Sequence, residues 1–220
     1  MWPLTLAYKE FRQLLPIQIV GFAIVLLTIL GMCGINLLYF FNSNSHAEIP
    51  FYNITTFQLL PVVGTLLAGT TGYWQTLSES MRGTWLFLWH RPVSRMRITL
   101  VKLVSGIGLI WLVMVLPMLV YALWAGSKGS IAAPFLWENT LMYWKSCFGL
   151  SMIYLSCYLS GLRQARWYGT RLLPVLAVSG AFLLTTTTEY YAGLSLLLIF
   201  AVDAILIAAI FTQCHLEDFS

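Results

Sequence analysis

Residues 99–125, TLVKLVSGIGLIWLVMVLPMLVYALWA, decide the fold class of this chain. Lys102 is the one charged residue in a run that exceeds the about 20 apolar residues an α-helix needs to cross a lipid bilayer. Length and apolarity together favour a helix that spans a membrane over an element in a water-soluble core.

Five more apolar runs accompany this one. They cover residues 17–41, 54–77, 139–160, 172–188 and 193–213. The run 172–188 is short and has Pro174 near its start, so it and the next run form either a tight hairpin or a re-entrant piece. We predict an all-α, polytopic membrane protein with about six transmembrane helices in a single domain over residues 1–220, with five or seven as alternatives.

The composition points to the same class. Hydrophobic residues make up 59% of the chain, charged residues make up 9%, and the mean hydropathy is +0.80. These values lie far from those of soluble globular proteins, and the connections are too short for a separate catalytic domain. The net charge of +4 comes from Lys and Arg spread over connections, so we expect contact with membrane lipid and no binding of nucleic acid.

The distribution of Lys and Arg predicts the orientation. Three segments that fall on one side of the membrane contain most of these residues, namely Lys9, Arg12, Arg82, Arg91, Arg95, Arg97, Arg163, Arg166 and Arg171. The connections on the other side contain Glu48, Lys128, Glu138 and Glu189. Because basic connections stay in the cytoplasm, we expect both termini to be cytoplasmic in an inner (plasma) membrane protein.

The first 16 residues differ from the apolar runs. Apolar side chains recur on one helical stripe and polar ones lie opposite. The apolar stripe is Leu4, Tyr8, Phe11 and Leu15, and the polar residues are Lys9, Arg12 and Gln13. Pro16 suits a bend from the membrane plane into the first span. We expect residues 1–16 to form an amphipathic elbow helix in the interface, as either a simple anchor or a specialised element.

The connection 78–98 is the longest on the basic side, and it has an acidic start, an apolar middle and a basic end. A short helix over 79–95 with exposed tryptophans suits docking to another protein, because buried Trp and Arg dominate binding at interfaces. The alternative is that Trp85 and Trp89 belong to the aromatic belt and the arginines meet lipid phosphates.

Two segments of the chain resemble permease subunits of type-2 ABC exporters. The residues that carry the resemblance are Lys9-Glu10, Glu79, Gly83-Thr84, Leu86 to Leu88, Arg91-Pro92-Val93-Ser94-Arg95 and Lys102. The resemblance implies a coupling helix between spans two and three that docks on a separate ATPase subunit, with the elbow beside it. It also implies that two permease copies, identical or related, form an export pathway.

The resemblance assigns roles to residues of this chain. The expected ATPase-coupling residues are Glu79, Arg82, Trp85, Leu88, Arg91, Pro92 and Arg95. The expected elbow residues are Lys9, Glu10 and Arg12. A second contact is expected from Arg163, Arg166 and Arg171, which otherwise serve membrane topology alone. ATP and Mg²⁺ are expected on the partner ATPase, and no cofactor or metal on this chain.

No catalytic residues are expected here. An ATP-hydrolysing chain would carry G-x-x-x-x-G-K-[ST], and this sequence has no Gly-Lys pair. An intramembrane protease would need a base or a metal site within a span, but His46, His90 and His215 all fall outside the middle of the runs.

Two features inside the runs remain. Asp203 lies near the middle of the last run, where an ionisable group costs several kcal/mol without a partner. It is either hydrogen-bonded to Ser, Thr or Tyr of a neighbouring span, or the ion or proton site of a secondary transporter, the rival function. Gly64, Ala68 and Gly72 recur every four residues, which lets a helix of this chain or of a second copy approach closely.

Overall fold

The computed structural model describes residues 2–32, 51, 59–81, 83, 94–127, 135–163, 170–187 and 192–216. Within them the fold is all-helical and no strand occurs, which confirms the predicted class. The elements are α1 (Trp2–Met32), α2 (Leu60–Met81), α4 (Arg95–Ala125), the 3₁₀ turn η2 (Trp137–Thr140), α5 (Leu141–Leu162), α6 (Leu173–Thr187) and α7 (Ala192–Leu216). The described residues therefore hold six α-helices at the places where the apolar runs were found.

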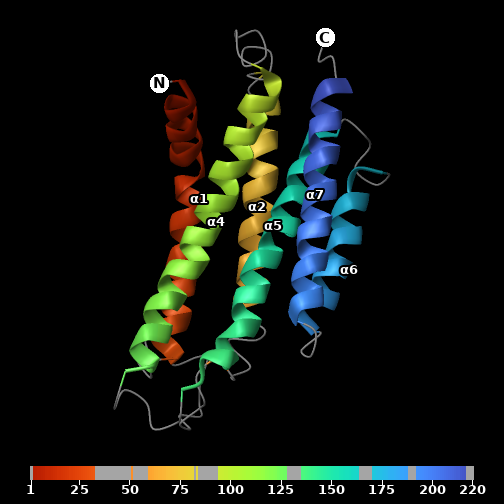
Figure 1. Ribbon diagram of the computed structural model, residues 1–220. Coiled ribbons are helices and arrows are strands. Elements are labelled where there is room, and N and C mark those ends of the chain that lie inside the picture. The colour runs from red at the N-terminus through yellow and green to blue at the C-terminus, as the bar shows by residue number, and fades with distance from the viewer. Residues whose placement is uncertain are drawn as a thin grey trace.

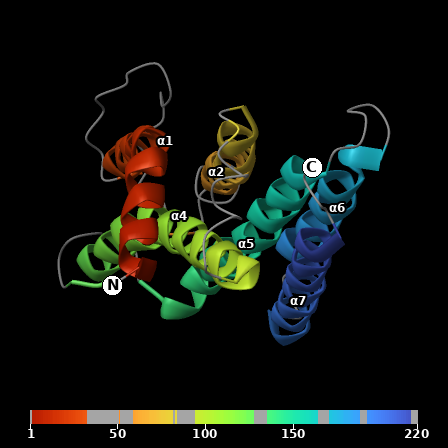
Figure 2. The same cartoon turned by 90° about the horizontal axis from the view of Figure 1, so that it is seen from above.

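The six helices form a single bundle (Figure 1). The first residues of α1 and the last residues of α7 lie at the same end of it. Figure 2 shows α5 in the middle, between α2 and α4 on one side and α6 and α7 on the other. α1 packs against α2 and α4 at the edge of the bundle.

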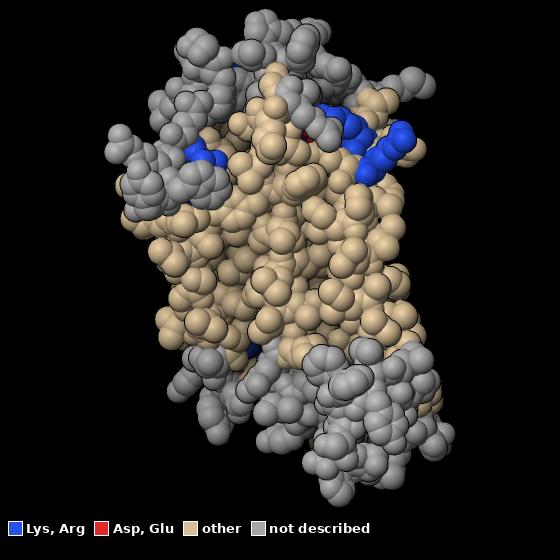
Figure 3. All heavy atoms as spheres, turned by 180° about the vertical axis from the view of Figure 1, so that it is seen from behind, with Lys and Arg blue, Asp and Glu red and all other residues tan. Residues whose placement is uncertain are grey.

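Within the described residues, three helices are long and apolar enough to cross a membrane. They are Thr5–Leu30, Arg95–Ala125 and Gly193–His215, and the shorter Leu173–Thr186 is also apolar. The space-filling view shows a broad middle band without charged side chains, while Lys and Arg gather towards one end (Figure 3). α2 and α5 are 22 residues long and contain more hydroxyl and amide side chains, which lowers their apolarity. The chain is a membrane protein by these features.

Small residues bring α2 close to α5 of the same chain. A Cβ on Gly72 would lie 2.6 Å from the carbonyl oxygen of Tyr154, and one on Gly64 would lie 2.8 Å from a methyl carbon of Leu150. Ala68 lies between them and is fully buried. The stripe predicted for close helix packing therefore faces α5, and contact with a second copy along this stripe is not needed to explain it.

The expected elbow is not separate from the first span. α1 is one helix from Trp2 to Met32 with Pro16 inside it, so the predicted bend at Pro16 is not confirmed. The side chains of this part of α1 divide between the inside and the outside of the bundle. Tyr8 and Phe11 are exposed, whereas Glu10 and Leu14 are fully buried. Glu10 has its ionic partner, Lys102, inside the bundle, and the exposed Tyr8 and Phe11 face outwards, where an apolar surface suits lipid.

The middle of the expected coupling segment lies outside the described residues. This holds for Arg82, Trp85, Leu88, Arg91 and Pro92, and also for Arg166 of the second expected contact. Glu79 and Arg95, which flank that segment, belong to α2 and α4.

Candidate functional site

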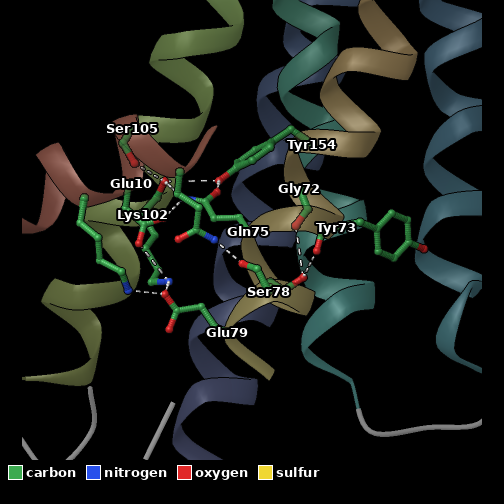
Figure 4. A network of polar contacts seen from close by, with 12 residues as sticks. Glu10, Gly72, Tyr73, Gln75, Ser78, Glu79, Lys102, Ser105 and Tyr154 are labelled. Carbon is green, nitrogen blue, oxygen red and sulfur yellow. Dashed lines mark hydrogen bonds and ion pairs between the residues drawn. The ribbon is translucent and has the colours of Figure 1, made fainter. Parts of the chain in front are cut away.

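A cluster of charged and polar side chains is buried near the end of the bundle where α1 begins (Figure 4). Its members come from four helices, namely Glu10 of α1, Gln75 and Glu79 of α2, Lys102 of α4 and Tyr154 of α5, and none is more than 2% exposed. We call these five residues the buried polar network. Lys102 lies seven residues into α4, roughly 10 Å from its first residue.

Ion pairs form the centre of the buried polar network. Lys102 Nζ lies 2.9 Å from Glu79 Oε1 and 3.2 Å from Glu10 Oε1. Lys9 Nζ, at the more exposed rim, lies 2.7 Å from the same Glu79 oxygen. Two lysines thus balance two glutamates. Balance matters because an unpaired charge costs several kcal/mol when it is held away from water.

Gln75 connects the ion pairs to the central helix. Its side-chain Nε2 donates to Glu10 Oε2 at 2.8 Å and to the Lys102 carbonyl oxygen at 3.1 Å. Its Oε1 accepts a hydrogen bond from the Tyr154 hydroxyl at 2.6 Å. The amide therefore uses both of its protons and its oxygen, which leaves one orientation of the side chain that satisfies every partner.

Gly106 makes room for this arrangement, and Ser105 adds a hydrogen bond beside it. Gly106 lies one turn after Lys102, and a Cβ there would be only 2.5 Å from Tyr154 Cζ, so the Tyr154 ring occupies the space of the missing side chain. Ser105 Oγ donates to the Lys102 carbonyl oxygen at 2.9 Å. A glycine in α4 thus lets a large aromatic residue of α5 reach the ion pairs.

Side-chain hydrogen bonds continue along the contact of α1 with α2. Gln13 Nε2 donates to Ser78 Oγ, and Gln18 Nε2 donates to Thr71 Oγ1 at 3.0 Å. The polar side of the first half of α1 is therefore directed at α2. Without water, such bonds between helices replace part of the attraction that apolar burial gives a soluble protein.

The residues predicted by resemblance separate into two groups. Lys9, Glu10 and Glu79 come together: Glu10 and Glu79 pair with Lys102, and Lys9 pairs with Glu79, although some 70 residues separate Lys9 from Glu79 in sequence. Arg12 is exposed and Arg95 is partly exposed at the start of α4. Sequence reasoning missed Gln75 and Tyr154. Gln75 is an amide within an otherwise weakly polar run, and this was a usable signal, but nothing marks Tyr154.

Arg171, expected to contact a partner, forms hydrogen bonds within this chain. Its guanidinium donates to the carbonyl oxygens of Ser160 at 3.0 Å and Gly161 at 3.3 Å, at the end of α5. A cation at the last carbonyls of a helix satisfies groups that have no partner within the helix. Arg163 donates to the Thr170 carbonyl oxygen at 3.3 Å. Both arginines thus hydrogen-bond to backbone carbonyl oxygens of this chain, between the end of α5 and the start of α6.

Asp203 faces α5 from the middle of α7, and its Oδ2 lies 2.5 Å from Ser151 Oγ. A hydrogen bond to a serine of a neighbouring helix is one of the two situations considered from the sequence. In the described part of the chain no group of three His, Cys, Asp or Glu side chains is placed to hold a metal ion.

These features define an all-helical membrane protein with a buried, charge-balanced network that joins α1, α2, α4 and α5. No family model, curated protein or solved structure matches the chain. Its class therefore comes from the fold and the network, and its function has to be argued from them.

Proposed function

We propose that this chain is the membrane-spanning permease subunit of an ATP-driven exporter and works with separate ATPase subunits. The observation that carries the proposal is the ion pairing of Glu79 with Lys102 and Lys9 and of Lys102 with Glu10. Glu79 begins the expected coupling segment and Lys102 follows it. A displacement of that segment is therefore transmitted directly to the helices on both sides and to α1.

The buried polar network makes these helices move as a unit. Moving Lys102 away from both Glu10 and Glu79 would leave the Lys102 and Glu10 charges unpaired in a water-poor interior, which costs about 3 to 5 kcal/mol. Tyr154 extends the connection to α5 through Gln75. A push on residues 79–95 is thus transmitted as a rigid-body movement of α1, α2, α4 and α5, and such movements of helix groups alternate access to a transport pathway.

The remaining parts of the proposal follow from the same assignment. The ATPase subunits bind ATP and Mg²⁺ on the cytoplasmic side, and a second permease copy, identical or related, completes the pathway. All six helices span the inner membrane and both termini are cytoplasmic. Support for this orientation comes from the basic connections and from the beginning of α1 and the end of α7, which share one end of the bundle (Figure 1).

Docking of an ATPase is tested with a matched pair of tryptophan variants. Trp85→Ala changes the expected coupling segment, and Trp124→Ala changes a half-exposed tryptophan at the far end of α4. The tagged full chain is purified from its native membranes in mild detergent, and the co-purified ATP-hydrolysing subunit is identified and titrated back. We expect Trp85→Ala to weaken ATPase binding about 5- to 150-fold, the loss of one interfacial anchor, at unchanged membrane abundance. Trp124→Ala should bind normally.

Two results would overturn the proposal. One is the absence of any ATP-hydrolysing subunit from the purified wild-type chain. The other is unchanged ATPase binding and unchanged stimulated turnover in Trp85→Ala, together with Arg91→Ala. The segment 79–95 would then be an ordinary basic connection.

A further inference from the structure

Asp203 and Ser151 form a contact that the proposed function does not use. Asp203 lies in the middle of Gly193–His215, one of three helices in the described part of the chain that are long and apolar enough to span a membrane. Its Oδ2 is 2.5 Å from Ser151 Oγ in α5. The same Ser151 oxygen is 2.6 Å from the carbonyl oxygen of Phe148, one turn earlier in α5. The Ser151 hydroxyl therefore lies within hydrogen-bonding distance of two other oxygen atoms.

The number of protons available to these three oxygen atoms decides whether Asp203 is ionised. A serine hydroxyl has one proton to donate, and a carbonyl oxygen has none. If Asp203 were ionised, both neighbours of Ser151 Oγ would be acceptors competing for a single proton. One of the two close oxygen pairs would then have no hydrogen between its atoms. A proton on Asp203 resolves this, because the carboxyl group donates to Ser151 and Ser151 donates to Phe148.

The surrounding charges point to the same state. Among the described residues Asp203 forms no ion pair, and its Oδ1 is buried without a hydrogen-bond partner. The described part of α6 contains no titratable side chain. Titratable residues on the other helices packed against α7 are Tyr143, Lys145, Cys147, Tyr154, Cys157 and Tyr158 of α5, and Arg95, Arg97, Lys102 and Tyr121 of α4. None of these cations is within ion-pairing distance of Asp203, and Lys102 is paired with Glu10 and Glu79.

We propose that Asp203 is a proton-binding site, occupied at neutral pH, at which a neutral carboxylic acid donates a hydrogen bond to Ser151 and fastens α7 to the central helix α5. A carboxylate with one hydrogen bond is costly in the middle of a bilayer, whereas the neutral acid leaves no charge there. The site holds a proton and not a metal cation, because Asp203 is the one carboxylate in this contact and the other groups are a hydroxyl and a helix carbonyl. This inference does not depend on the transport assignment.

Infrared spectroscopy of the purified full chain in lipid nanodiscs tests the proposal. At pH 7 we expect a C=O stretching band of a protonated carboxylic acid, with a small downward shift in D₂O. Asp203→Asn should abolish the band, and Glu138→Gln, at an exposed residue of η2, should leave it intact. Ser151→Ala removes the acceptor and should move the band to higher frequency. If the band is absent at pH 7, or if it survives unchanged in Asp203→Asn, no protonated carboxylic acid is detected at Asp203 and the proposal fails.

A second measurement separates the proton from folding. Asn keeps a donor for Ser151 and takes up no proton, so Asp203→Asn should fold in detergent and lack the contribution of residue 203 to the pH dependence of the melting temperature. Asp203 stays neutral in the folded chain but ionises when the chain unfolds, so the wild-type melting temperature should fall relative to that of Asp203→Asn as pH rises from about 4 to 7. Equal pH dependence of the two proteins would also refute the proposal.

Discussion

α5 and α7 show opposite relations between apolarity and burial. Every residue from 149 to 162 in α5 is buried, and the buried set includes hydroxyl groups at Ser151, Tyr154 and Ser160. α7 contains one of the three apolar spans and yet exposes large side chains such as Leu197 and Phe200. The more polar helix is inside and the more apolar helix is outside.

The difference follows from the solvent. In water, apolar side chains are driven to the interior, but lipid tails are as apolar as leucine and provide no such drive. Close backbone approach and hydrogen bonds between helices then decide which helix is central. Gly72 allows the close backbone approach of α2 to α5, and the hydroxyl of Tyr154 forms a hydrogen bond between these two helices. The comparison of α5 with α7 leads to three predictions about stability.

The largest effect is expected where the buried polar network is broken. Lys102→Met removes the cation that Glu10 and Glu79 share, and Lys9 remains near Glu79 alone, so Glu10 becomes an unpaired buried charge. We expect a loss of about 3 to 5 kcal/mol in the free energy of unfolding, measured by equilibrium denaturation in mixed micelles.

A double variant gives the control for this loss. Glu10→Gln combined with Lys102→Met removes both charges, so most of the lost stability should return, as a double-mutant cycle will show. Additive losses in the double variant would mean that the two side chains are not coupled and that the ion pair is not what holds α1 to α4.

The next largest effect is expected at the close approach of α2 to α5. Gly72→Leu inserts a side chain where even a Cβ would be 2.6 Å from the Tyr154 carbonyl oxygen, so the two helices must separate. Overpacking of this kind costs about 1 to 3 kcal/mol or more, measured in the same denaturation assay. Gly108→Leu in α4 is the matched control, because a Cβ at Gly108 has open space around it. Equal losses in both variants would contradict the proposed packing.

The smallest effect is expected on the exposed side of α7. Leu197→Ala should change the free energy of unfolding by no more than about 0.5 kcal/mol, because Leu197 is 68% exposed and has few contacts to lose. The same change at Leu150 of α5, which is 1% exposed, should cost about 2 to 5 kcal/mol. A result in the reverse order would show that α7, and not α5, is the central helix.

The places of the helices were predictable from apolar runs. The runs 99–125 and 193–213 correspond to α4 (Arg95–Ala125) and α7 (Ala192–Leu216). The start of α1 was not predictable in this way, because residues 3–15 are too polar for a span when they are considered alone. Lys9 and Glu10 become acceptable within a continuous helix only because Glu79 and Lys102 face them across the bundle.

The candidate site was predictable in part. Resemblance selected Lys9, Glu10 and Glu79 for an elbow and an ATPase contact, and the structure pairs them with one another and with Lys102. Their contact with an ATPase stays a prediction. Gln75 and Tyr154 could not be selected, because a residue becomes part of a network only through partners far away in the sequence.

The sequence by itself determined that this chain is a helical membrane protein. Without water, each backbone polar group must be satisfied within its own segment, and apolar runs of span length satisfy this only as helices. The tertiary structure alone decided which side of each helix is inside. Lipid and protein interior are both apolar, so hydropathy does not distinguish them. That choice depends on the fit of Gly72 against α5 and of Lys102 between two glutamates, which exists only when the helices are side by side.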